Sequence, residues 1–220
     1  TLFDNTQYTS LAIQNPWVMP VADMKITSNE KKYITIEVSA GKRLDYSIGV
    51  SINEYKNLPF FNRILGTDVN TFGLKYQAIF EKRASTLELD AKLRYQFSDK
   101  LLFVNTLNYK QFNLIKDNAK PWGILPLEVN SSFNWLPNKK WIIEASAVYW
   151  TGAAQFESNN KAYDLKNVFV LNAGFTFKLS SAWSVWAKGE NLLDKPYERW
   201  AYYPSLGAQI TGGIIYSFRK

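Results

Sequence analysis

Cysteine and histidine are both absent from the 220 residues of this chain. Without cysteine there are no disulfides and no thiolate nucleophiles. Without histidine the commonest general base is missing, and with both gone nearly every zinc site is excluded. We therefore predict that the chain is not an enzyme, with no catalytic residues, no bound metal and no cofactor.

Long apolar runs and blocks of one charge are also missing. No apolar stretch reaches the roughly 18 to 20 residues that a membrane-spanning helix needs. The net charge of +7 is spread along the chain, whereas a nucleic-acid-binding surface is normally clustered, so we expect no nucleic-acid partner. The chain begins at Thr1 with neither Met nor a signal peptide, which indicates a mature chain or a fragment.

Aromatic residues are abundant, with 8 Trp, 13 Tyr and 14 Phe. This enrichment suits either a carbohydrate-binding β-sandwich or a barrel with aromatic girdles, and does not choose between them. The mean hydropathy of −0.25 is compatible with a membrane barrel, because strands that alternate apolar and polar residues average to neutral.

Alternation with a period of two is the strongest signal in the chain. The clearest example is 87–97, where apolar residues alternate with Glu88, Asp90, Lys92, Arg94 and Gln96. About ten such segments follow one another: 33–40, 44–53, 72–80, 87–97, 101–109, 125–135, 141–149, 169–177, 183–187 and 208–218. Several have the 9–11 residues, roughly, that a membrane-crossing strand needs, against about five to six in soluble sheets. We predict an all-β, antiparallel transmembrane β-barrel, complete in itself or part of a larger barrel.

The connections alternate in length, as in outer-membrane barrels with short periplasmic turns and long extracellular loops. Tight turns are expected at 98–99, 137–139 and 180–181, and long loops at 111–122, 151–164 and 191–207. The pattern fails near the start, where 81–83 would be a short outer loop and 56–70 a long inner connection. Residues 1–30 read as irregular, with a short strand at 8–13 and a turn at 27–29, and 31–220 as barrel strands.

The last strand, 208–218, ends its apolar face in two aromatics, and with the segment before it resembles the closing region of TonB-dependent outer-membrane receptors. The matching residues are Asn191, Leu192, Asp194, Tyr197, Tyr203, Pro204, Gly213, Tyr216, Ser217 and Phe218. The segments 198–204 and 56–61 look like the Bacteroidetes-type version. Two features depart from the pattern: 204–208 replaces the usual Pro-Gly-Arg, and Arg219-Lys220 follow the terminal aromatic.

The resemblance implies an outer-membrane protein of a Gram-negative bacterium, whose full barrel has 22 strands and a plugged lumen. This chain can supply neither the plug nor 22 strands, so we expect the C-terminal part of a receptor for a nutrient or a metal chelate. The alternative is a structural barrel subunit of an outer-membrane assembly without transport of its own. A soluble β-sandwich adhesin or lectin is the weaker third reading.

Expected partners are outer-membrane lipid, the barrel-assembly machinery, an outer-membrane lipoprotein, and the energy-coupling protein through a plug absent from this chain. The candidate ligand contacts are Trp200, Tyr202 and Tyr203 in the last long loop. The expected barrel-closing signal is Gly213, Ile214, Tyr216 and Phe218.

Charged residues on the polar faces are expected to line the lumen: Glu88, Asp90, Lys92, Arg94, Lys188 and Glu190. Glu88 and Asp90, about 7 Å apart by strand rise, could instead form a glycosidase-like acid–base pair. A mixed-charge ladder is the stronger reading, because Lys92 and Arg94 continue the same face. Five tryptophans are expected in interfacial belts more than in a sugar platform: Trp135, Trp141, Trp183 and Trp186 near the tight turns, and Trp150 at the opposite rim.

Overall fold

The computed structural model describes residues 18–19, 28–40, 43–65, 74–115, 120–157 and 161–218. The expected strand at 8–13 and most of the expected irregular segment 1–30 lie outside these ranges. Within them, no helix is long and apolar enough to cross a membrane. The turn expected at 27–29 is wrong in part, because Ser28 and Asn29 already belong to a strand.

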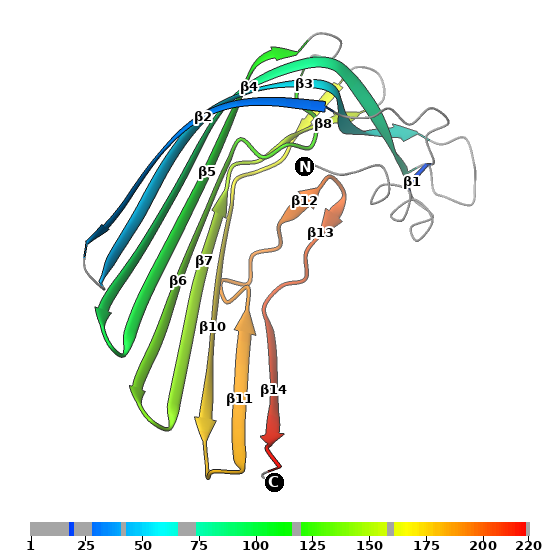
Figure 1. Cartoon of the computed structure of the whole chain (residues 1–220). Coiled ribbons are helices and arrows are strands. Elements are labelled where there is room, and N and C mark those ends of the chain that lie inside the picture. Colours follow the sequence, from blue (N-terminus) through cyan, green and yellow to red (C-terminus); the bar gives the residue numbers. More distant parts are fainter. Residues whose placement is uncertain are drawn as a thin grey trace.

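Ten strands form one large sheet, which Figure 1 shows as a curved wall. Nine of them are antiparallel neighbours in the order β14-β11-β10-β7-β6-β5-β4-β3-β2. Their bounds are β2 (Ser28–Ala40), β3 (Leu44–Leu65), β4 (Leu74–Ser98), β5 (Leu101–Ile115), β6 (Leu127–Asn138), β7 (Trp141–Trp150), β10 (Val168–Lys178), β11 (Trp183–Glu190) and β14 (Gln209–Tyr216). The tenth, β1 (Val18–Met19), pairs in parallel with β4.

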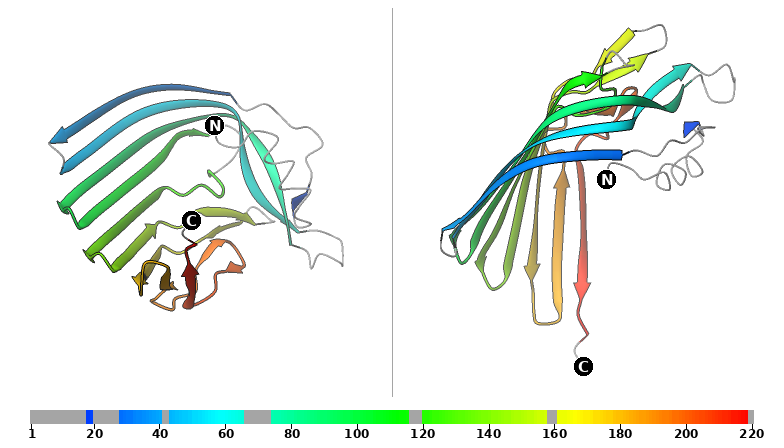
Figure 2. Two further views of the ribbon diagram at one scale, coloured as in Figure 1. Left: turned by 60° about the horizontal axis from the view of Figure 1, so that its bottom comes forward. Right: turned by 45° about the horizontal axis from the view of Figure 1, so that its top comes forward.

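The sheet curves in an open arc from β2 to β14 (Figure 2), and these two strands are its ends in the described part of the chain. Two separate hairpins lie outside the sheet: β8 (Ala154–Glu157) with β9 (Lys161–Asp164), near its upper end, and β12 (Glu198–Trp200) with β13 (Tyr203–Pro204), above the upper ends of β11 and β14 in Figure 1. No second sheet packs against the aliphatic residues of 87–97 in the described ranges. The β-sandwich alternative is therefore wrong.

Strands β3 and β4 are the longest, with 22 and 25 residues, and they pair over nearly their whole length. Glu81 and Arg83, expected in a loop, sit mid-strand opposite Leu58 and Lys56. The expected strands at 72–80 and 87–97 are one strand, and 56–65 is strand rather than an inner connection. The charged run suggested a turn, but the hairpin pairing continues through it, and the Glu81 side chain is fully buried. With this correction the short and long connections alternate along the entire sheet.

Burial along β3 is the reverse of that in a soluble protein. Ile52 is 50% exposed, whereas its neighbour Asn53 is 1% exposed, and Ser51 is buried too. Soluble domains rarely expose contiguous apolar surface and rarely bury polar residues. The apolar face is therefore the outer one, as the alternation predicted for strands in lipid.

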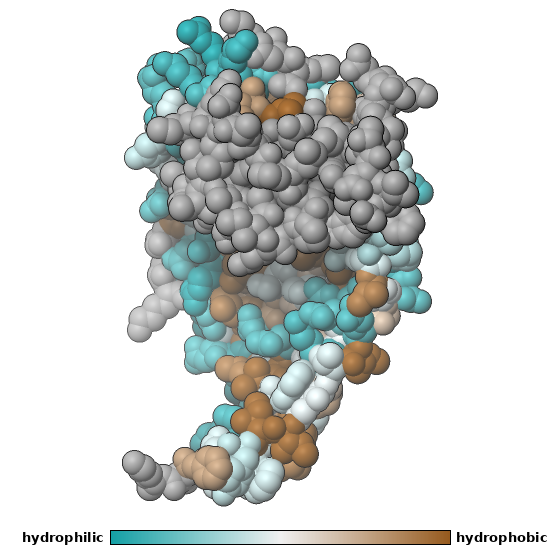
Figure 3. Space-filling model, turned by 90° about the vertical axis from the view of Figure 1, so that its right-hand side faces the viewer, coloured by the Kyte–Doolittle hydropathy of each residue, from teal (hydrophilic) through white to brown (hydrophobic). Residues whose placement is uncertain are grey.

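Aromatic rings gather on the outer face close to the short turns. Trp141 lies 4.5 Å from Phe177, Phe103 lies 4.6 Å from Phe133, and Tyr95 lies 4.6 Å from Phe97 between ring centroids. Strongly hydrophobic residues also cover the lower part of the molecule in Figure 3, toward the C-terminal end. These rings form the girdle expected at one membrane–water interface.

Candidate functional site

The inner wall of the sheet is a ladder of hydrogen-bonded polar side chains. Asn53 Nδ2 donates to Ser51 Oγ at 3.2 Å, and Asn172 Nδ2 donates to Ser146 Oγ at 3.2 Å. The bond from Asn105 Nδ2 to Ser131 Oγ at 2.6 Å lies instead on the outer face, because Asn105 pairs with Leu93. The inner-wall side chains satisfy one another while facing water, which is the arrangement of an aqueous lumen.

Glu88 is the most engaged of the expected lumen charges. Its Oε1 lies 2.9 Å from Lys110 Nζ and accepts hydrogen bonds from Tyr55 Oη and Thr86 Oγ1, both at 3.0 Å. An acid–base catalyst needs a carboxyl that can reach a substrate, but this side chain is only 14% exposed and already has three partners. The geometry therefore favours the structural ladder over a glycosidase-like pair with Asp90.

The other expected lumen charges lie on the same wall. Arg94 Nη1 is 3.3 Å from Asp45 Oδ2, and Lys188 Nζ is 2.7 Å from Glu190 Oε1. Asp90 and Lys92 line a hollow of about 220 Å³ over β2 to β5. Among the described residues, no three acidic side chains lie close enough together to hold a metal ion.

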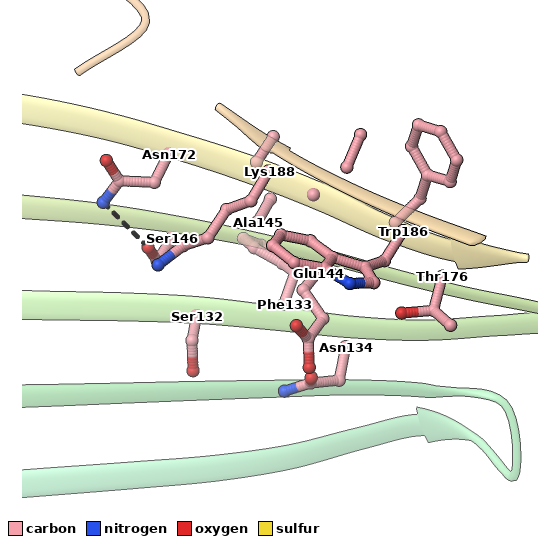
Figure 4. A pocket seen from close by; sticks show the side chains of 14 residues that line it. Ser132, Phe133, Asn134, Glu144, Ala145, Ser146, Asn172, Thr176, Trp186 and Lys188 are labelled. Atoms are coloured by element: carbon pink, nitrogen blue, oxygen red, sulfur yellow. Dashed lines mark hydrogen bonds between the residues drawn. The ribbon is translucent and has the colours of Figure 1, made fainter. Parts of the chain in front are cut away.

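A larger hollow of about 380 Å³ opens on the inner wall of β6, β7, β10 and β11 (Figure 4). Its polar lining includes Asn172, Glu144 and Lys188, and Trp186 lies beside them. The Trp186 ring covers Gly213 of β14, where an added Cβ would stand 2.9 Å from the indole nitrogen. Trp186 is thus an inner-wall residue and not part of the outer girdle, which corrects the expectation. Sequence distance to the turn suggested a belt, but strand parity decides the face.

Trp150 contacts the last long loop: its ring lies 5.3 Å from the Tyr197 ring, in an edge-to-face arrangement. By parity it shares the inner face with Ser146 and Val148. Its expected role in a second outer belt is therefore wrong.

The upper halves of β3 and β4 and the long connections pack together at the upper end of the sheet and make the only sizeable apolar core in the described residues. Tyr55, Leu58, Phe60, Ala84 and Trp122 form one buried cluster, and Ala153, Leu165 and Ala201 form another. Buried Gln155 joins two loops, because its Oε1 accepts the Ala201 N–H at 2.8 Å. Sequence reasoning missed Gln155, since a polar residue in a loop shows no signal of burial.

Trp200, the first candidate ligand contact, is part of this loop packing. Its ring lies over Gly123, which has φ of 78°, and the Arg199 guanidinium carbon lies 5.1 Å from the ring centroid. Arg199 Nη1 also donates to the Gly123 carbonyl at 3.4 Å. Burial lowers the pKa of Arg199 below its usual value, and the Glu128 carboxylate opposes that shift.

Tyr202 and Tyr203 are more accessible, at 45% and 43% exposed. The Tyr202 ring stacks at 5.2 Å on Tyr163, whose hydroxyl donates to Glu198 Oε2 at 3.2 Å. The loop therefore presents two tyrosines at its surface, while Trp200 holds the loops together.

The segment that carries the family resemblance forms a clamp at the base of the last loop. Asn191 Nδ2 donates to the carbonyls of Lys195 and Leu206 at 3.0 and 3.1 Å, and Asn191 N–H donates to Asn172 Oδ1 at 3.0 Å. Asp194 Oδ1 accepts the Ala208 N–H at 2.8 Å, immediately before β14 begins. These bonds set where the last strand starts.

Three residues of the expected closing signal, Gly213, Ile214 and Tyr216, lie on β14, and Phe218 follows two residues after its end. Ile214 is 68% exposed, and the Tyr216 ring lies 4.6 Å from those of both Trp183 and Phe218. Gly213 is the exception, because it faces inward beneath Trp186. Recognition of these residues by an assembly machinery stays a prediction.

Comparison with known proteins identifies the architecture. No family model and no curated protein sequence matches the chain. Among solved structures, the siderophore receptor PirA from Acinetobacter baumannii superposes with a TM-score of 0.69 at 16% identity, over 91% of this chain and 33% of that chain. The copper transporter OprC gives 0.66 at 14% identity over 90% and 32%. The ferric enterobactin receptor PfeA from Pseudomonas aeruginosa, in complex with enterobactin, gives 0.64 at 18% identity over 87% and 32%.

The fold is thus that of a Gram-negative outer-membrane β-barrel receptor. More narrowly, the chain matches a C-terminal portion of the barrel of TonB-dependent receptors for siderophores and copper. It spans about a third of the length of these structures.

Proposed function

We propose that this chain is the C-terminal part of the barrel of a TonB-dependent receptor that takes up a nutrient or a metal chelate. The observation that carries the proposal is the inverted burial of β3, with exposed Ile52 beside buried Asn53, on a sheet that superposes on siderophore and copper receptors. An outward apolar face and an inward polar face are what a solute-conducting barrel requires.

We place the first contact with the ligand on the upper loops, at Tyr202 and Tyr203, with Trp200 as the residue that supports them. Exposed aromatic rings on a packed loop base offer flat apolar surface and hydroxyl groups at a fixed position. A plug and an energy-coupling protein belong to this proposal by analogy with the family, as does the Bacteroidetes-type origin.

The test replaces Tyr202 and Tyr203 together by alanine in the native gene of the source bacterium. Uptake of labelled siderophores, metal complexes and oligosaccharides is then measured, with Leu206→Ala as the control in the same loop, because Leu206 is 70% exposed. We expect at least a tenfold loss of uptake for one ligand class in the tyrosine variant and little change in the control. Unchanged uptake of every ligand in the complete gene deletion would reject transport.

A structural barrel subunit is the second candidate. It is favoured by the dense packing of the upper loops, which suits a stable platform for a lipoprotein. Stable co-purification of a lipoprotein, together with normal uptake in the deletion strain, would support this candidate instead.

A further inference from the structure

The hollow of about 380 Å³ on the inner wall, which we call the Trp186 hollow, lies on the neighbouring strands β6, β7, β10 and β11 (Figure 4). Its volume falls within the range of about 300–1,000 Å³ that small-molecule sites occupy. All of its lining residues belong to these strands and none to the long connections. It is therefore a separate feature from the tyrosines of the upper loops, Tyr202 and Tyr203.

A missing side chain forms the floor of this hollow. Gly174 of β10 pairs with Glu144 of β7 on one side and with Lys188 of β11 on the other. The strands approach so closely that a Cβ at Gly174 would stand 3.0 Å from the Ala187 carbonyl oxygen. Two strand spacings, about 10 Å, separate the Cα atoms of Glu144 and Lys188. The glycine therefore leaves open space between a carboxylate and an ammonium group.

Trp186 supplies a flat aromatic surface beside this floor. It pairs with Thr176 of β10 and with Gly213 of β14, and its ring lies over Gly213, where no side chain displaces it. A tryptophan in such a position offers an apolar face and an indole N–H donor to a ligand in the lumen. For this tryptophan the alternative of a sugar platform therefore fits better than a membrane belt.

Polar side chains around the hollow are left without partners. Asn134, Glu144 and Thr176 form no hydrogen bond or ion pair with another residue of the described ranges. The one hydrogen bond between lining side chains joins Asn172 to Ser146 (Figure 4). Glu88, higher on the same wall, has three partners by contrast. The donors and acceptors of the hollow are therefore available to a solute.

The charges of the lining select against a strongly charged ligand. Glu144 and Lys188 are its only charged residues, and their formal charges sum to zero. Lys188 is already paired with Glu190 at 2.7 Å, so an anionic chelate would meet the Glu144 carboxylate without a free cation to hold it. The other polar groups are neutral donors and acceptors: Ser132, Asn134, Ser146, Asn172 and Thr176. Hydroxyl groups, which both donate and accept, match this set.

We propose that the Trp186 hollow binds an uncharged saccharide, with one sugar ring against the Trp186 indole and its hydroxyls bonded to Asn134, Glu144 and Thr176. The Glu144 carboxylate only accepts hydrogen bonds, and sugar hydroxyls donate them. This inference rests on the proposed function and names the class of nutrient. A saccharide that has passed the upper loops binds again on the inner wall of the barrel.

The test uses the complete protein, purified in detergent from the outer membrane of the source bacterium, and isothermal titration calorimetry. The probes are maltotetraose, xylotetraose and chitotetraose, with spermidine as the cationic comparator and ferric enterobactin as the anionic one. The site variants are Trp186→Leu and Glu144→Gln. The matched controls are Trp183→Leu, on the outer face of the same strand, and Glu37→Gln, on the inner face of β2 outside the hollow.

We expect at least one tetrasaccharide to bind the parent. Each site variant should raise its Kd at least about tenfold, and each control should change it less than about twofold. Circular dichroism checks that all four variants keep their strands. Binding of no tetrasaccharide overturns the inference, as does an equal loss in the site variants and the controls.

Two further outcomes would give the hollow to another occupant. Binding of spermidine or ferric enterobactin that only the site variants lose, without saccharide binding, would show a site for a charged ligand. Thr176→Cys adds a thiol to a chain that has none. Complete protection of this thiol from a water-soluble maleimide, with or without saccharide, would show that protein covers the hollow. Uptake in the deletion strain decides the proposed function separately, so a receptor that imports a metal complex but binds no saccharide fails this inference alone.

Discussion

At the scale of single residues, the function of this protein depends on which of two neighbouring side chains faces lipid. Leu93 pairs across the sheet with the exposed Tyr46, whereas the adjacent Arg94 reaches Asp45 on the inner wall. One position along a strand therefore separates hydrocarbon from water.

Leu93→Arg is expected to weaken membrane insertion by about 2–4 kcal/mol, because it puts a cation on the lipid-facing side near mid-depth. Arg94→Leu, the control, should change insertion by less than about 1 kcal/mol, since it removes only a half-exposed ion pair. A urea titration of folding into lipid vesicles measures both. Equal effects at the two positions would contradict the assigned faces.

Asn191 combines two demands, a φ of 49° and a donor to two carbonyls. Asn191→Gly keeps the backbone conformation but loses the two side-chain hydrogen bonds, so we expect the free energy of unfolding to fall by about 1–3 kcal/mol. Asn191→Ala loses the same hydrogen bonds and should lower the free energy of unfolding by a further about 1–2 kcal/mol, because alanine is strained in the left-handed backbone conformation. Urea unfolding with proteolysis of the 191–208 loop measures both variants. Similar stability of the parent and both variants would show that the clamp is unimportant.

At the scale of elements, the hairpin of β3 and β4 is the feature that distinguishes this sheet from a minimal barrel. In its lower half, apolar and polar residues alternate along each strand. Its upper half bends over the end of the sheet (Figure 1), and Asn57 of β3 has a φ of 53°. Phe60 is fully buried there and lies 5.9 Å from the Phe112 ring. The upper half therefore belongs to the loop core rather than to the membrane.

Phe60→Ala is expected to destabilise the upper loop core by about 3–5 kcal/mol, because it empties a closed site. The hairpin beyond Asn57 should then become sensitive to protease while the sheet below stays resistant. Ile52→Ala is the control in the same strand, since its side chain is exposed on the outer face. Limited proteolysis in detergent, read by mass spectrometry, separates the two. Cleavage spread evenly over the sheet would contradict independent packing of the loops.

At the scale of the whole molecule, the protein is one curved sheet with an apolar outer face toward lipid and a polar inner face toward water. Two tryptophans of β11 report these sides, because Trp183 stacks on Tyr216 in the girdle and Trp186 covers Gly213 on the inner wall. The girdle and the loop core mark its two ends.

In vesicles of brominated lipid, the fluorescence of Trp183 is expected to be quenched and that of Trp186 spared. Trp183→Phe should therefore reduce the quenched fraction, and Trp186→Phe should raise it. Both changes keep an aromatic ring of similar volume, so far-UV circular dichroism should not change. Equal quenching in the two variants would place both rings on one face.

The sequence by itself determined the strand class, the lipid-facing side and the alternation of turns and loops, because a period of two is a local property that each strand carries in its own residues. It also located the closing segment through Asn191 and Asp194. Tertiary structure alone decided that β3 and β4 continue past Lys56 and Arg83, since polar residues there look the same in a loop and in a strand above the membrane. It likewise decided that Trp186 lies over Gly213 and that Gln155 is buried, because these contacts come from strands and loops distant in sequence. The inward face of Trp186, by contrast, follows from parity within β11.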